Sequence, residues 1–169
     1  MTKAIRQIRI EGKIAYVPLT KGYTAIIDAD DAWLVCGWNW CANVFKNTVY
    51  AVRGEATTGK KKTITLHRVI TSAPGALHVD HHNGDGLDNR KSNLRLVTRS
   101  QNMSNRRVNQ NNTSGFKGVS WNKRKSKWQS QIQQNRSRKR LGYFHTPEEA
   151  HAAYCEASAR LHGEFGRTA

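Results

Sequence analysis

The sequence predicts an α+β protein in two parts. One ends in a strand–loop–strand–helix unit, and the other is a small three-stranded antiparallel sheet with one packed helix. Short apolar runs, two distinct helix starts and a polar stretch between the halves indicate this division. The 169 residues suffice for one ordinary domain or two small ones. We therefore expect domains at 1–104 and 115–169, joined by a linker at 105–114.

The first half reads as a series of short strands. Residues 5–27 alternate apolar and polar side chains, which predicts antiparallel strands. Residues 28–36 carry acidic side chains at their start and are followed by Gly37, which predicts a short helix. Three further elements are expected in order: a hairpin of 38–41 and 48–52, a strand at 63–66 and a helical turn at 67–71.

The most informative stretch runs from residue 79 to 102. Asp80 and His81 end a short apolar run, and a loop rich in Gly, Asn and Asp leads to a second run at 94–97. Thr98 then begins a helix through a capping box, with Asn102 in its first turn. Oxygen ligands and a base in this order favour one hard divalent cation held against a phosphate.

Each of these residue types suits one role in phosphodiester hydrolysis. His81 suits the base that activates water, because the imidazole pKa lies near neutrality. Asp80 and Asn102 suit the ligands of Mg²⁺ or Mn²⁺, and the Asn93 amide is placed to tie the loop and orient His81. Neighbours on a regular strand point to opposite faces, so Asp80 and His81 can share a site only if the strand ends or bends there.

The same loop has a plainer interpretation, in which its polar side chains satisfy their own backbone. We favour that interpretation for four side chains, namely Asn83, Asp85, Asp88 and Asn89. His78 and His82 are interpreted as surface or packing residues. A calcium loop is disfavoured, because the segment lacks the regular Asp-x-Asp-x-Asp-Gly order with a closing Glu.

The charge of the chain indicates a polyanionic partner. Lys and Arg number 28 against 12 acidic residues, a net charge of +16, which favours nucleic acid over an anionic membrane surface. No apolar run approaches the length of a spanning helix, and the start lacks an apolar signal core, so we expect a cytoplasmic protein. The three cysteines form no Cys-x-x-Cys pair, so no structural zinc is expected.

The second half is the denser basic region, with net +9 over residues 105–169. Strands are expected at 116–121, 128–133 and 139–144, and a helix begins after Thr146 with Pro147 and a closing Glu149. Eight basic and no acidic residues lie between Lys123 and Arg140. Interleaved apolar residues argue against a disordered tail. A basic sheet face of this kind suits the DNA major groove.

Two groups of residues resemble known families. The motifs Leu-His-Arg-Val-Ile at 66–70 and Val-Asp-His-x-Asn-Gly-Asp at 79–85, continued by Asn-Leu-Arg-Leu-Val-Thr at 93–98, closely resemble the HNH homing endonucleases of phages and mobile introns. The resemblance covers about residues 10 to 104. It implies a ββα-metal fold with His81 as general base, Asn93 as the loop-fixing Asn, and Asp80 and Asn102 as metal ligands. His67 is given a supporting or phosphate-contacting role near the site.

The C-terminal half resembles the plant ethylene-response-factor, or AP-two, type of DNA-binding domain over about residues 114 to 166. The matching motifs are Phe-Lys-Gly-Val at 116–119, Leu-Gly-Tyr-Phe at 141–144 and Glu-Glu-Ala at 148–150. In that family the sheet enters the major groove. The resemblance implies that eight side chains face DNA: Lys117, Trp121, Arg124, Lys127, Gln129, Gln131, Arg138 and Arg140.

Together these features predict a metal-dependent endonuclease of double-stranded DNA that a C-terminal module positions on the duplex. Because a single metal site cuts one strand per encounter, nicking or cutting by a homodimer is the natural expectation. The rival is a non-catalytic DNA-binding regulator with a degenerate nuclease fold, which the complete set of site residues disfavours. RNA binding is weaker still, since no aromatic RNA-recognition signature is present.

Overall fold

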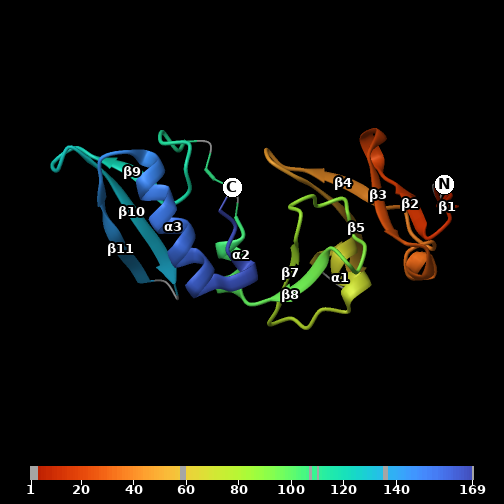
Figure 1. Ribbon diagram of the computed structural model, residues 1–169. Helices are drawn as coiled ribbons and strands as arrows, with labels where there is room; N and C mark the ends of the chain where they lie inside the picture. Colours follow the sequence, from red (N-terminus) through yellow and green to blue (C-terminus); the bar gives the residue numbers. More distant parts are fainter. Residues whose placement is uncertain (1–3, 58–59, 107, 110, 135–136, 169) are drawn as a thin grey trace. The chain divides into compact units, whose positions relative to one another are not determined.

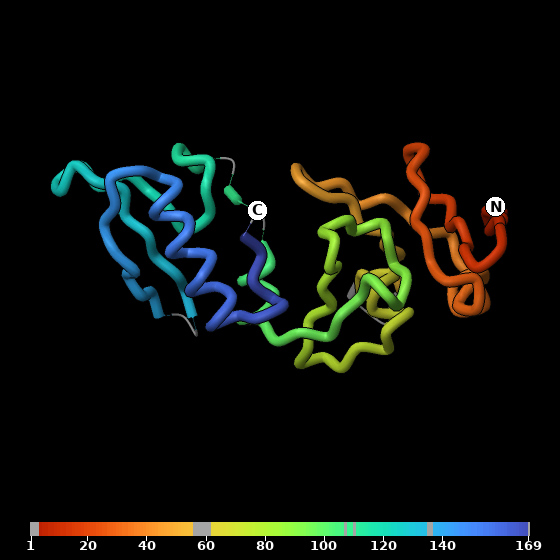
Figure 2. The backbone as a smooth tube through the Cα atoms, in the orientation of Figure 1, coloured from red at the N-terminus to blue at the C-terminus, as the bar shows by residue number. Residues whose placement is uncertain are grey.

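The computed structural model describes residues 4–57, 60–106, 108–109, 111–134 and 137–168. The chain forms two compact units, the first up to Val97 and the second from Thr98 (Figures 1 and 2). The chain combines several small antiparallel sheets with few helices, which confirms the mixed α and β composition that the sequence predicts.

The first unit begins with a three-stranded antiparallel sheet in the order β1-β2-β3. Its elements are β1 (Arg9–Glu11), β2 (Ile14–Pro18), the 3-10 turn η1 (Thr20–Gly22) and β3 (Thr24–Asp28). Ala15 and Val17 of β2 are buried while their neighbours are partly exposed, as the alternating sequence predicts. One face of this sheet therefore lies on the core.

The helix expected over 28–36 is instead a 3-10 helix, η2 (Ala29–Leu34). Asp28 precedes it without capping it. Its carboxylate accepts a hydrogen bond from the Lys91 backbone N–H at 2.8 Å, so the side chain that would stabilise an α-helical start is used elsewhere. The side chain expected to cap this helix thus takes part in a long-range contact instead.

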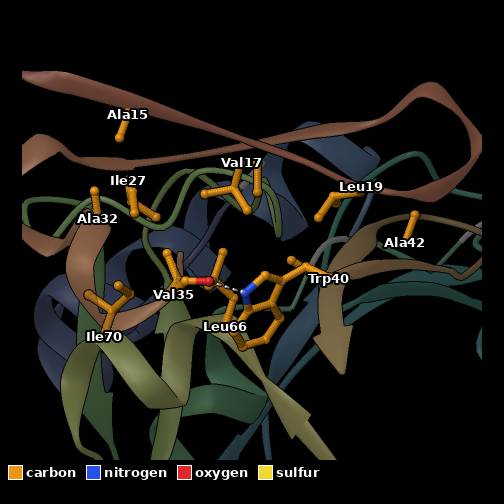
Figure 3. Close-up of a cluster of buried hydrophobic side chains, with 12 residues drawn as sticks. Ala15, Val17, Leu19, Ile27, Ala32, Val35, Trp40, Ala42, Leu66 and Ile70 are labelled. Carbon is orange, nitrogen blue, oxygen red and sulfur yellow. Dashed lines mark hydrogen bonds between the residues drawn. The ribbon is translucent and has the colours of Figure 1, made fainter. Parts of the chain in front are cut away.

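The core of the first unit is centred on Trp40, which is 1% exposed (Figure 3). Its indole Nε1 donates to the Val35 carbonyl at 3.1 Å, so the one polar atom of the ring is satisfied. Val17, Leu66 and Ile70 lie in the same cluster. The sheet and the first helix therefore share one hydrophobic core.

A second sheet in the order β4-β5-β6 leads to the first α-helix. Its elements are β4 (Cys41–Val44), β5 (Val49–Thr57), β6 (Lys60–Thr65) and α1 (Leu66–Thr71). The expected hairpin is present, although its first strand starts at Cys41 rather than at Trp38. Trp38 lies ahead of the strand, with the Arg53 guanidinium 3.9 Å from its ring centre. A two-stranded ribbon, β7 (His78–His81) and β8 (Leu94–Val97), completes the unit.

The second unit contains α2 (Arg99–Ser104), β9 (Val119–Asn122), β10 (Lys127–Gln134), β11 (Ser137–Phe144), α3 (Pro147–His162) and the 3-10 turn η3 (Gly163–Phe165). The antiparallel sheet has the order β11-β10-β9, and α3 lies across one face of it (Figure 1). Ile132, Tyr154 and Ala157 form the buried contact between them.

Both expected capping boxes are present. Thr98 and Gln101 cap α2, and Thr146 and Glu149 cap α3, each pair through reciprocal side-chain and backbone bonds. Among the helices in the described part of the chain, none is long and apolar enough to cross a membrane.

Candidate functional site

The loop between β7 and β8, residues 82–93, is fixed to the first sheet by backbone hydrogen bonds. Ile26 of β3 donates to the Leu87 carbonyl at 2.9 Å and accepts from Asn89 N–H at 2.7 Å. The Lys91 ammonium, in turn, contacts the Asp31 carboxylate at 2.6 Å. A Gly- and Asn-rich loop is therefore held in one conformation by the core of its own unit.

Asn93 ties the two ends of this loop together. Its side-chain oxygen accepts from the Asn83 N–H at 3.0 Å, and its amide nitrogen donates to the Asp88 carbonyl at 2.8 Å. The side chain is buried, so both bonds form away from water. This geometry supports the loop-fixing role expected of Asn93. The catalytic importance of that role stays a prediction.

Three other polar side chains in the loop bond locally, as the plainer interpretation expects. Asn83 Oδ1 accepts from Asp85 N–H at 2.8 Å, and Asp85 Oδ1 accepts from Leu87 N–H at 2.9 Å. Asp88 forms a close ion pair with Arg90 at 2.7 Å, which together with its other hydrogen bonds lowers the pKa of the Asp88 carboxyl. These residues shape the loop.

Asn89 has a different position, which the sequence reasoning missed. Its Oδ1 lies 3.4 Å from Nε2 of His81, and its amide nitrogen donates to the Leu87 carbonyl at 3.0 Å. Because the amide nitrogen is occupied as a donor, the oxygen must face the ring and can only accept. His81 Nε2 is then the protonated nitrogen, and Nδ1 carries the basic lone pair.

His81 itself is 5% exposed at the end of β7. Its ring centre lies 5.2 Å from that of His67 and 5.7 Å from that of Tyr50. Burial lowers the pKa of His81, and the hydrogen bond that its ring donates to Asn89, together with the nearby carboxylates, only partly offsets this effect. The imidazole is therefore neutral at pH 7, the form that a general base requires.

His67 is the first-turn residue of α1 that lies against His81. Its Nε2 is 3.0 Å from the Thr65 hydroxyl oxygen. Burial, followed by the charges of His81 and Arg68, lowers the pKa of His67 to about 3. Two neutral imidazoles therefore pack edge to face here. His67 lies next to His81, as a residue with a supporting role in the site must.

Asp80 points to a different partner from its neighbour His81. Asp80 and His81 are the last two residues of β7, so the strand ends where the two side chains would have to share a site. The Asp80 carboxylate, however, contacts Arg95 across the ribbon. Arg95 Nη2 and Nε donate to Asp80 Oδ2 at 2.7 and 3.2 Å. Asp80 is 7% exposed, so this ion pair is largely shielded from water.

Asn102 lies on α2, which belongs to the second compact unit. Its backbone N–H donates to the Thr98 carbonyl at 3.0 Å, and its side chain is partly exposed. The division between the units falls after Val97, whereas the sequence places the domain end at 104. The joint role of Asp80 and Asn102 as ligands, and the boundary at 104, stay predictions.

The candidate DNA-binding residues lie mostly on one face of the second unit's sheet. By strand register, Gln131 faces Arg140 and Gln133 faces Arg138 across β10 and β11. The Gln129 amide nitrogen contacts Gln131 Oε1 at 3.5 Å, so these glutamines share the face. Ser130 and Ile132 point to the other face and are buried on the α3 side. The alternation also places Lys127 with the glutamines.

Trp121, Lys117 and Arg124 lie off this face. Trp121 is opposite Trp128 in the register, edge to face at 5.2 Å, and shares the side of α3. The Lys117 ammonium donates to the carbonyls of Ser104 and Arg167 at 2.6 and 2.9 Å, and its burial lowers the pKa to about 8. Arg124 is exposed in the β9–β10 turn. Their DNA contacts stay predictions. The strand register does not support the contact of Trp121, and the internal hydrogen bonds of the ammonium do not support that of Lys117.

Comparison with known proteins matches both halves of the chain to families. The HNH endonuclease family matches residues 66–104, and the AP2 domain family matches residues 114–164. Protein 3.8 of Escherichia phage T7 is 34% identical over 100 residues, which cover 56% of this chain and 77% of that protein. This chain belongs to the family of Protein 3.8, with an HNH endonuclease domain followed by an AP2 domain. No solved structure matches it.

The HNH match begins at α1 and ends with α2, so β7, β8 and α2 supply its ββα order. It contains every residue expected to act in the site, from His67 to Asn102. The AP2 match contains the whole sheet and nearly all of α3. The two domains together indicate a nuclease family and DNA binding, in the order that the sequence predicts.

Proposed function

We propose that this protein is a divalent-metal-dependent endonuclease of double-stranded DNA, of the homing type, which its AP2 domain holds on the duplex. The observation that carries the proposal is His81. It is a buried, neutral imidazole at the end of β7, oriented by Asn89 and lying next to a buried carboxylate within the HNH match.

In this proposal His81 removes a proton from the attacking water through Nδ1. The carbonyl-type oxygen of Asn89 holds Nε2–H, which fixes the tautomer and aims the basic nitrogen. The contacts with His67 and Tyr50 limit the rotation of the ring. Asn93 keeps the loop that carries Asn89 closed.

The donor types at the site fit a hard cation such as Mg²⁺ or Mn²⁺. Asp80 and Asn102 would supply one carboxylate and one amide oxygen, and Mg²⁺ usually takes only one or two protein carboxylates. The described residues contain no cluster of three or more His, Cys, Asp or Glu side chains arranged for a metal. When bound, the cation would stabilise negative charge on the phosphate and on the departing 3′-oxygen.

The AP2 domain would supply most of the affinity for DNA. Its sheet face presents Lys127, Arg138 and Arg140 around a row of glutamine amides. Basic side chains bind phosphates and set position, whereas glutamine can bind adenine edges in the major groove. One metal site cuts one strand, so the proposal includes nicking or a homodimer. The T7 relative favours action inside a phage-infected cell.

A plasmid-cleavage assay tests the proposal. Supercoiled plasmid and phage DNA are incubated with the full chain with Mg²⁺, with Mn²⁺ and with EDTA. Cleavage should require the metal. His81→Ala should lower the rate about 10²-fold or more, the scale for loss of a positioned general base, without changing DNA affinity. His82→Ala is the matched control, because His82 is the exposed neighbour.

A non-catalytic regulator is the rival function. It would bind the same DNA with the same salt dependence and give no metal-dependent product on any substrate. Cleavage that persists in EDTA, or that His81→Ala leaves intact, would contradict the mechanism.

A further inference from the structure

The buried ion pair between Asp80 and Arg95 has no role in the steps above. Asp80 of β7 and Arg95 of β8 are directly opposite in the ribbon register. Their side chains are 9% and 15% exposed. Ion pairs so shielded from solvent interact more strongly than surface pairs, so Arg95 substantially balances the Asp80 charge.

Two hydrogen bonds from the guanidinium, from Nη2 at 2.7 Å and from Nε at 3.2 Å, reach the carboxylate oxygen Oδ2. Arg95 therefore occupies, at that oxygen, the place and the charge that a cation would have. A divalent ion that binds the Asp80 carboxylate must displace this guanidinium or accept its repulsion.

We propose that Arg95 is a built-in counter-cation that competes with the divalent metal for Asp80. This inference rests on the proposed function, because it takes Asp80 as a metal ligand. Arg95 keeps the carboxylate charge-balanced and in one rotamer while no metal is bound, and it weakens metal binding to the protein alone. Once a metal holds the carboxylate, the guanidinium is released to bind another anion, and a DNA phosphate has the matching geometry.

A neighbouring charge changes the cation affinity of a carboxylate by a known scale. In a site shielded from water, one neighbouring unit charge changes the affinity for a second charge by about tenfold to a thousandfold. Water and the remaining ligands screen a hydrated divalent ion more than a proton. We therefore expect the lower end of this range.

The test is a titration of the full chain with Mn²⁺ in the absence of DNA. Binding is measured by calorimetry and by the electron paramagnetic resonance signal of Mn²⁺. Arg95→Gln should bind Mn²⁺ about tenfold more tightly than the natural chain, the lower limit of the charge effect. Arg95→Lys keeps the charge and should stay within about threefold. Arg90→Gln is the matched control. It removes one arginine from the same ribbon and loop, but its partner is Asp88.

Asp80→Asn separates the two levels of the proposal. If Asp80→Asn loses Mn²⁺ binding and only Arg95→Gln tightens it, the inference is supported. If Asp80→Asn loses binding while Arg95→Gln is unchanged or weaker, Arg95 is merely structural; the inference fails and the proposed function stands. Equal tightening by Arg90→Gln assigns the effect to net charge and also overturns it. If Asp80→Asn binds Mn²⁺ normally, Asp80 is not a ligand and both fail.

A second measurement uses the natural chain, in case Arg95→Gln does not fold. The Nε–H resonance of Arg95 is followed by NMR while Mg²⁺ is added. The hydrogen bond to Asp80 predicts that this signal moves or exchanges with water as Mg²⁺ binds, and that the Arg90 signal does not. A signal that stays unchanged at saturating Mg²⁺ overturns the competition.

Discussion

Nε2 of His81 lies 3.4 Å from Oδ1 of Asn89, and the Asn89 amide nitrogen is occupied by the Leu87 carbonyl. The two contacts together set both the tautomer and the direction of the imidazole. Asn89 is fully buried, so bulk water cannot readily replace its hydrogen bond to His81. The pair connects the loop conformation to the base.

The first prediction follows from this contact. Asn89→Ala should lower the cleavage rate about tenfold to a hundredfold, the usual effect of losing a partner that orients a functional histidine. DNA affinity should stay within twofold, since Asn89 is buried. Asn83→Ala is the control in the same loop, because Asn83 is exposed and binds Asp88 rather than His81. Equal rate losses for both variants would assign the effect to the loop as a whole.

The second prediction concerns Gly86, where the loop meets β5. A Cβ atom there would lie 2.4 Å from the Val49 carbonyl oxygen and 2.7 Å from ring carbons of Tyr50. Gly86→Ala should therefore lower the free energy of unfolding by about 1–3 kcal/mol, the cost of forcing atoms into a packed site. Gly75→Ala is the control, since nothing lies within 4 Å of a Cβ at that position.

Urea unfolding of both variants measures the difference. Because Tyr50 also contacts His81, Gly86→Ala should reduce cleavage as well as stability. Equal stability of the two alanine variants would mean that the loop does not pack on β5 in solution.

The third prediction is a pH dependence of stability from His67. Its pKa in the folded chain is about 3, below the usual histidine value of 6.5. Between these values the unfolded chain binds one more proton at this site, so the free energy of unfolding falls as pH decreases from about 6.5. Above that pH the contribution is complete. One such histidine gives a slope of at most about 1.4 kcal/mol per pH unit.

Urea unfolding at several values between pH 7.5 and pH 5 checks this slope. His67→Gln should make the curve flatter by about one proton, since glutamine does not titrate. His78→Gln, at an exposed position of β7, should leave it unchanged. The opposite slope, with stability rising in acid, would show that His67 is charged in the folded chain.

The sequence predicted the elements that depend on local patterns. Alternation placed β2 and β3, and Thr98 and Thr146 marked the helix starts, because capping acts within a few residues. The roles of Asp80 and His81 could be proposed from residue type and order. Their partners could not, because Arg95, Asn89 and Tyr50 reach them through strand register and loop packing. Likewise, the Asp28 side chain does not cap the helix that follows it but accepts a hydrogen bond from Lys91, a partner far along the chain.

The last prediction tests the sheet face of the AP2 domain through the salt dependence of DNA binding. Arg138 and Arg140 lie on that face, opposite Gln133 and Gln131. Each phosphate contact contributes about 0.9 to the slope of log K against log salt. The double variant Arg138→Gln, Arg140→Gln should therefore reduce the slope by about 1.8 if both contact phosphates. Arg160→Gln is the control, because Arg160 is exposed on α3.

A fluorescence titration of duplex DNA from 50 to 300 mM salt, roughly the range over which such slopes are measured, gives the three slopes. Each substitution removes one positive charge, in the sheet variant as in the control. A general electrostatic attraction would therefore lower the slope equally for each arginine removed. A selective change in the sheet variant instead requires that this face meets the backbone. If Arg160→Gln altered the slope as much per residue, the effect would be general electrostatic attraction, and the prediction that the glutamine-lined face binds the DNA backbone would fail.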